Sequence, residues 1–160
     1  MKALFAGSFS PPTCGHLDII RRGAQLFDEL LVAVLSQAGK AYPLAPERRA
    51  QMLRTITRDM PNVKIVHSEG LLVDLMRETG AEVILRGVRE PIDMREELQI
   101  AEAHRKLGGY ETLFLPSLPE HSRLSSTIVR DCAFHQADLR GMAPDEIIDE
   151  IYAVYAKARI

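Results

Sequence analysis

The sequence predicts an α/β fold in which five parallel strands form one sheet with helices on both faces. Short apolar runs typical of buried strands alternate with segments whose apolar residues recur at helical spacing. Loops rich in polar, glycine and basic residues follow these runs, where an open α/β sheet places its ligands. This alternation predicts right-handed crossovers and a doubly wound, Rossmann-like sheet, followed by a C-terminal helix.

The predicted strands are short and apolar, as expected of strands covered on both faces. They occupy residues 4–6, 30–35, 63–66, 83–85 and 112–115. The first ends at Gly7, the fourth ends in Arg86 and Gly87, and Pro116 closes the fifth. Because the strands are predicted to be parallel, we expect their carboxyl ends to share one edge of the sheet.

Helical patterns separate the strands. After Gly15 and His16, apolar residues recur at positions 17, 20, 24 and 27, and Pro46 suits the first turn of a second helix. Further helices are predicted at residues 71–78, 92–107, 125–134 and about 145–157. Gly80 stops the first of these and a Gly-Gly pair stops the second. The last has one apolar face, typical of a helix that packs on a core.

Length and composition favour a single domain over residues 1–160. The chain has 46% hydrophobic and 26% charged residues, an ordinary balance for a soluble protein. A net charge of -2 gives no general basic field for nucleic acid, and no apolar run approaches the roughly 18 residues of a membrane span. Two distant cysteines without a CxxC do not indicate a zinc site, so no metal ligands are assigned. We expect a cytoplasmic protein.

The loop after the first strand, GSFSPPTCGHLDII, carries the most unusual chemistry. It matches neither the GxGxxG dinucleotide loop nor the GxxxxGK[ST] phosphate loop. Gly15 and His16 begin a helix, where free N–H groups and the positive dipole end collect phosphate. The dipole should lower the pKa of His16 and keep its imidazole neutral. From spacing alone, a histidine that merely caps the helix or lies in the core stays an equal alternative.

Two motifs carry a family resemblance. Thr13-Cys14-Gly15-His16 resembles the (T/H)xGH signature of the nucleotidyltransferase superfamily, and LSSTIVR at residues 124–130 resembles its second signature. Over nearly the whole chain the sequence is similar to the phosphopantetheine adenylyltransferase family, with supporting stretches such as LAPERRAQML, VILRGVRE and EELQIAEAHRKL. The resemblance implies attack of the 4'-phosphopantetheine phosphate on the α-phosphate of ATP, giving dephospho-coenzyme A and pyrophosphate.

The resemblance also implies a role for individual residues. His16 and Lys40 would be catalytic, with His16 stabilising the pentacoordinate α-phosphate. The acceptor would be bound by Ser8, Lys40, Leu72 and Arg86, with Leu72 lining its arm. ATP would be bound by Ser8, Phe9, His16, Gly87, Val88, Arg89, Glu97, His121, Ser122, Arg123, Leu124, Ser125, Ser126 and Thr127. Among these, Ser126 is the expected direct phosphate contact.

Other expectations come from the same resemblance. Mg²⁺ would be the cofactor, brought by ATP, because no carboxylate cluster suggests a protein cage. The family implies a homohexamer and feedback inhibition by coenzyme A.

The places of three arginines are predicted from the sequence. Arg130 is ambiguous between a pyrophosphate contact and a structural cap. Arg48 and Arg49 are predicted to lie on solvated or interface helix faces.

Three other functions share these signatures or this fold. A nicotinamide or nicotinic acid mononucleotide adenylyltransferase would need an aromatic surface for its pyridine ring, and the chain has no Trp. A cytidylyltransferase for phosphorylated alcohols is a second alternative. A non-catalytic nucleotide sensor is the third, although the loss of His16 or Lys40 would be expected in it. Pyrophosphate release with each acceptor distinguishes the enzymes.

Overall fold

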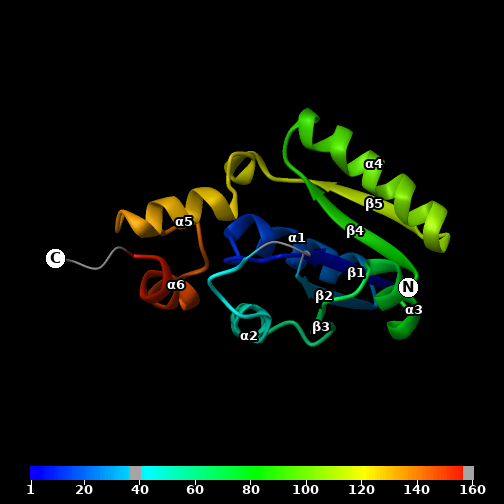
Figure 1. Cartoon of the computed structure of the whole chain (residues 1–160), viewed down its shortest axis with the longest axis horizontal. Coiled ribbons are helices and arrows are strands. Elements are labelled where there is room, and N and C mark those ends of the chain that lie inside the picture. The colour runs from blue at the N-terminus through cyan, green and yellow to red at the C-terminus, as the bar shows by residue number, and fades with distance from the viewer. Residues whose placement is uncertain (37–40, 157–160) are drawn as a thin grey trace.

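The computed structural model describes residues 1–36 and 41–156, with residues 91 and 92 described by their backbone alone. One five-stranded sheet in the order β3-β2-β1-β4-β5 organises this part of the chain (Figure 1). Every neighbouring pair of strands is parallel. The strands are β1 (Lys2–Gly7), β2 (Glu29–Leu35), β3 (Val63–Ser68), β4 (Val83–Val88) and β5 (Glu111–Pro116). The predicted fold class is thereby confirmed.

Four helices connect each strand to the next: α1 (Cys14–Leu26), α2 (Pro46–Ile56), α3 (Leu72–Thr79) and α4 (Pro91–Gly108). Two more follow β5, α5 (Ser126–Phe134) and α6 (Ile148–Tyr155), with short 3-10 turns at Pro119–His121 and Asp145–Ile147. The sequence boundaries agree to within a few residues, but the last predicted helix begins as a 3-10 turn. In Figure 1, α5 and α6 lie at the end of the molecule away from the N-terminus.

Two apolar clusters cover the two faces of the sheet. Successive side chains of β1 point to opposite faces and so join different clusters. Ala3 and Phe5 join the larger cluster, which α1, α2, α5 and α6 complete. Leu4 and Ala6 join the smaller cluster, to which α3 contributes. No described helix is long and apolar enough to cross a membrane.

The fourth strand is longer than the sequence predicts. Arg86 and Gly87, expected just beyond its end, pair with Phe114 and Leu115 of β5 inside the ladder. A β-carbon at Gly87 would lie 2.9 Å from Cγ1 of Ile19, so the missing side chain lets α1 lie close to β4. The extension carries Arg86 to the mouth of the site.

Candidate active site

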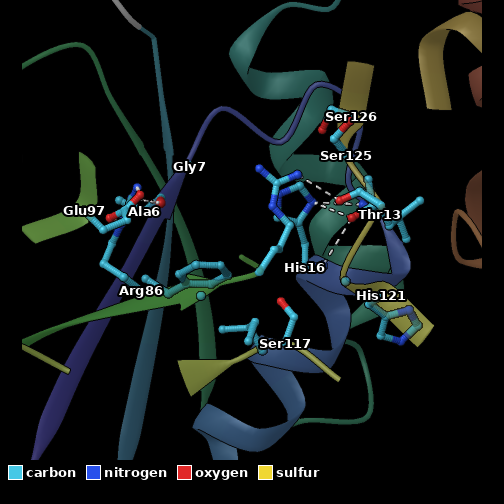
Figure 2. Close-up of a pocket in the computed structure, with 16 residues that line it drawn as sticks. Ala6, Gly7, Thr13, His16, Arg86, Glu97, Ser117, His121, Ser125 and Ser126 are labelled. Carbon is cyan, nitrogen blue, oxygen red and sulfur yellow. Dashed lines mark hydrogen bonds and ion pairs between the residues drawn. The ribbon is translucent and has the colours of Figure 1, made fainter. Parts of the chain in front are cut away.

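A cavity of about 270 Å³ opens at the carboxyl ends of β1 and β4 (Figure 2). The start of α1 and the segment that leads into α5 form its other walls. This is the edge at which open parallel sheets bind ligands. Strand ends and helix starts, far apart in the sequence, therefore meet at one site.

Nine of the residues predicted to bind substrates line this cavity. They are His16, Arg86, Gly87, Arg89, Glu97, His121, Leu124, Ser125 and Ser126. Sequence reasoning did not assign Ser117 or Ile19, which also line it. Ser117 directly follows β5, so the strand-end rule that drew attention to the other loops also points to this residue.

Other predicted residues lie elsewhere in this structure. Ser122 and Arg123 line a neighbouring hollow that Arg89 and Ser125 share. Leu72 is buried in the cluster on the α3 face, with 7% of its surface exposed, so its predicted contact with the acceptor arm stays a prediction. The remaining predicted residues absent from the cavity lining are Ser8, Phe9, Val88 and Thr127. Lys40 lies outside the described residues.

His16 both caps α1 and lines the cavity. The Thr13 backbone N–H donates to Nδ1 of His16 over 3.0 Å, and the His16 backbone N–H donates to the Thr13 hydroxyl oxygen over 3.2 Å. This reciprocal pair is a capping box, with histidine in the usual place of Glu or Gln. Because Nδ1 accepts a hydrogen bond, a neutral His16 carries its proton on Nε2. His16 is thus a helix cap that also lines the cavity, and its predicted contact with phosphate stays a prediction.

The His16 imidazole is held neutral by its surroundings. Burial lowers the pKa of His16 to about 4, and the positive charges of Arg89 and Arg86 add to this effect. We expected the helix dipole to lower the pKa; burial is the largest cause. The ring packs edge-on against Phe9, with 5.0 Å between ring centroids. A neutral ring in this fixed position offers one N–H to an anion.

Two helix starts face the cavity. At α1, the Cys14 N–H donates to the Met142 carbonyl, and no hydrogen bond is found from the Gly15 N–H within the described chain. At α5, the Ser125 hydroxyl caps the helix by accepting from the Ile128 N–H over 3.2 Å. Helix starts with free N–H groups attract anions such as phosphate. The cavity is therefore suited to a ligand with several phosphates.

Arginines supply the positive charge of the site. Arg86 forms a two-pronged ion pair with Glu97, with distances of 2.6 and 2.5 Å, and donates to the Ala6 carbonyl over 2.9 Å (Figure 2). Arg89 bonds to Asp93 and to the Leu124 carbonyl. Glu97, predicted to contact ATP, binds Arg86 in this structure.

Side chains of α5 form hydrogen bonds with the loop after β1. The Ser126 hydroxyl, expected to contact phosphate, donates to the Pro11 carbonyl over 2.8 Å. Arg130 donates to the Ser10 carbonyl over 2.6 Å and to the Thr127 hydroxyl oxygen. Arg130 therefore links α5 to the loop after β1, and its predicted pyrophosphate contact stays a prediction.

Arg49 departs most from the sequence prediction. It was expected on a solvated or interface helix face, but its side chain is completely buried. Its neighbour Arg48 is 60% exposed and pairs with Glu150 at the surface. Helical spacing separates the two adjacent arginines. Arg49 lies on the buried face of α2, with Met52, Leu53 and Ile56 at i+3, i+4 and i+7, and Arg48 does not.

Comparison with known proteins agrees with this geometry. Residues 4–132 match the family model described as cytidylyltransferase-like. The chain is 42% identical to the phosphopantetheine adenylyltransferase of Prochlorococcus marinus strain NATL2A, over 94% of this chain and 96% of that one. It is 42% identical to that of Rubrobacter xylanophilus, over 98% and 96%, and 41% identical to that of Symbiobacterium thermophilum, over 99% of both.

A solved structure supports the fold independently. A Vibrio parahaemolyticus protein, provisionally assigned as a nicotinate-nucleotide adenylyltransferase, superposes with a TM-score of 0.68 at 17% identity, covering 98% of this chain and 96% of that one. Likeness at this identity concerns the fold alone. The family follows from the sequence matches: the chain belongs to the phosphopantetheine adenylyltransferase family, within the cytidylyltransferase-like group.

Proposed function

We propose that the chain transfers the adenylyl group of ATP to 4'-phosphopantetheine, giving dephospho-coenzyme A and pyrophosphate. The observation that carries this proposal is family membership at about 40% identity over nearly the full length. The site supports it, because a neutral histidine and two arginines line one cavity with two helix starts.

The reaction requires that two anions meet. An oxygen of the acceptor phosphate forms a bond to the α-phosphorus of ATP, and the bond from that phosphorus to the oxygen bridging to the β-phosphate breaks. Pyrophosphate leaves with the electron pair, so no enzyme-bound intermediate is required. Arg86 and Arg89 would offset the repulsion between the anions. Catalysis is then mainly positioning and charge stabilisation.

His16 would stabilise the transition state. Its Nε2–H would donate to a non-bridging oxygen of the α-phosphate, where negative charge grows as the fifth ligand approaches. Nδ1 is fixed by the Thr13 N–H, so the donor nitrogen has one orientation. A neutral ring can donate without accepting a proton, and its lowered pKa suits that role.

Arg86 would change partner when the acceptor binds. Its guanidinium already has the planar, two-pronged geometry that suits a carboxylate or a phosphate. Glu97 would either share Arg86 with the acceptor phosphate or release it. Lys40 is proposed as a second cation for the acceptor, on the family resemblance alone.

Magnesium would enter as the ATP complex. Among the described residues, no three His, Cys, Asp or Glu side chains are grouped so as to hold a metal ion. Glu97 and Asp93, which lie near the phosphate site, are both paired with arginines. These residues do not form a protein cage for Mg²⁺, so we propose MgATP as the substrate.

We also propose an oligomeric state, an inhibitor and a location for the protein. A homohexamer and inhibition by coenzyme A are expected from the resemblance, and the cytoplasmic location from composition. Leu98 and Leu107 of α4 and Leu113 of β5 are each about half exposed, which supports self-association through these elements. Light scattering coupled to size exclusion measures the number of subunits.

The decisive experiment measures pyrophosphate release with Mg²⁺ and ATP against three acceptors: 4'-phosphopantetheine, nicotinate mononucleotide and phosphocholine. CTP replaces ATP in a parallel set, and mass spectrometry identifies the product. We expect release with ATP and 4'-phosphopantetheine, and formation of dephospho-coenzyme A. Activity with the mononucleotide and none with phosphopantetheine would overturn the proposal. The absence of turnover with any acceptor, despite nucleotide binding, would indicate a sensor.

A further inference from the structure

A fully buried arginine lies beside the site but does not line it. Nη1 of Arg49 donates to the Ser8 carbonyl over 2.5 Å and to the Leu35 carbonyl over 3.3 Å. Nη2 donates to the Ser36 hydroxyl oxygen over 2.9 Å, and Nε donates to the Leu44 carbonyl over 3.2 Å. The guanidinium is therefore bonded on all three of its nitrogens.

The Arg49 charge has no carboxylate partner in the part of the chain described. No ion pair within 4.0 Å is found there, and its acceptors are three carbonyls and a hydroxyl. The Tyr42 ring packs against the guanidinium, with 4.3 Å between the guanidinium carbon and the ring centroid. Arginine is almost never fully buried unless it is paired. Burial without a counter-ion is costly, which makes a purely space-filling role a poor explanation.

The hydrogen bonds of Arg49 join two strand ends. Ser8 directly follows β1, while Leu35 is the last residue of β2 and Ser36 follows it. Ser8 leads into the loop that ends at the His16 capping box. We propose, on the basis of the function proposed above, that Arg49 is a positioning residue for adenylyl transfer. It holds Ser8 in fixed relation to the end of β2 at Leu35 and Ser36, so that the loop leading to His16 stays aligned with the reacting phosphates.

Arginine is well suited to this role. Its planar fork carries five N–H donors in fixed directions, so one side chain can reach acceptors on two strands at once. Lysine offers a single ammonium and is not equivalent at a site with several fixed acceptors. An apolar side chain of similar size would fill the space and leave the carbonyls of Ser8 and Leu35 without this donor.

The test compares Arg49→Met and Arg49→Lys with Arg48→Met, the matched control on the same helix. Small misplacements of reacting groups can lower rates about 100-fold, so we expect Arg49→Met to lower kcat by roughly 10- to 100-fold. The KM values for ATP and phosphopantetheine should change far less, and Arg49→Lys should give an intermediate kcat. Arg48→Met should keep the wild-type kcat, because it removes only a surface ion pair.

Chemical rescue separates positioning from stability. Arg49→Ala leaves space for a guanidinium ion, so millimolar guanidinium should raise its kcat several-fold and leave wild type and Arg48→Met unchanged. If Arg49→Met and Arg49→Ala do not fold, Arg49→Lys carries the test. Variants that melt at lower temperature but keep the wild-type kcat per folded molecule, without rescue, would overturn the proposal. A wild-type enzyme inactive with phosphopantetheine would instead refute the proposed function.

Discussion

His16 both caps the start of α1 and lines the cavity. As the third residue of α1 it accepts the Thr13 N–H and completes a capping box, and its ring also lines the cavity. The cap therefore fixes the tautomer, because the nitrogen that accepts from the backbone leaves its proton on the other. The local geometry of a helix start thus places a neutral N–H donor at the cavity.

Replacement of His16 tests this donor. His16→Ala should lower kcat by about 10²- to 10³-fold, the usual loss for one transition-state donor, with little change in ATP affinity. Loss of the cap should also cost about 1 kcal/mol of stability. Steady-state kinetics and urea unfolding measure the two effects separately. His16→Gln, which can keep the cap, serves as the stability control, and a near-normal kcat in His16→Ala would leave His16 as a cap alone.

The lowered pKa of His16 has a consequence for stability. Because the folded pKa is about 4 and the ordinary value is 6.5, the unfolded chain takes up the proton first as the pH falls. This residue should therefore make the protein less stable between about pH 6.5 and pH 4, and not above that range. The imidazole signal of His16 in NMR spectra, assigned by its absence in His16→Gln, should stay unshifted from pH 8 to about pH 5. A midpoint near 6.5 would contradict this expectation.

Single-residue roles were predictable where a motif fixes them locally, and less so where packing decides. The place of His16 followed from the Gly-His pair at a helix start. The burial of Arg49 was not predicted, although its spacing from Met52, Leu53 and Ile56 places it on the apolar face of α2. Ser126 was expected to contact phosphate, but its hydroxyl bonds to a loop more than 100 residues away in sequence. A hydrogen bond between residues so far apart in the sequence cannot be predicted from the spacing of apolar residues.

At the scale of elements, the site depends on how closely α1 packs on β4. Alternating apolar runs predicted these elements and placed the carboxyl ends of the strands at one sheet edge, which the parallel sheet confirms. The sequence did not reveal that β4 continues through Arg86 to Val88, because a charged residue and a glycine are typical of a strand end. β4 extends through Val88 because Arg86, Gly87 and Val88 pair with residues 114–116 of β5.

Gly87→Ala tests this close packing. The new β-carbon would lie 2.9 Å from Cγ1 of Ile19, so α1 or the Ile19 side chain must move. Overpacking of this kind typically costs 1–3 kcal/mol, and we expect about that loss in urea unfolding. Because α1 carries His16, kcat should also fall. Gly70→Ala is the matched control, since its β-carbon would meet only the Ser68 hydroxyl oxygen at 3.6 Å. Equal stability of the two variants would contradict the packing account.

At the scale of the whole molecule, both ends of the chain build the site. The loop after β1 is tied by Arg130 of α5 through the Ser10 carbonyl, and the Ser10 hydroxyl lies 3.2 Å from the Tyr155 hydroxyl of α6. The helix α6 is anchored in turn by Ile147 and Ile151, which are buried in the larger core cluster. The C-terminal helices therefore help to hold the loop after β1 in place.

Ile151→Ala tests whether this support matters for the whole fold. The side chain is completely buried, and a large-to-small change of this kind costs about 2–5 kcal/mol. For a chain of this size each kcal/mol lowers the melting temperature by about 2–4 °C. Val154→Ala on the same helix, where the side chain is 37% exposed, should change it much less. If α6 supports the β1 loop, Ile151→Ala should also lower kcat at temperatures where it is fully folded. A destabilised variant with an unchanged kcat would show that α6 stabilises the domain without positioning the loop.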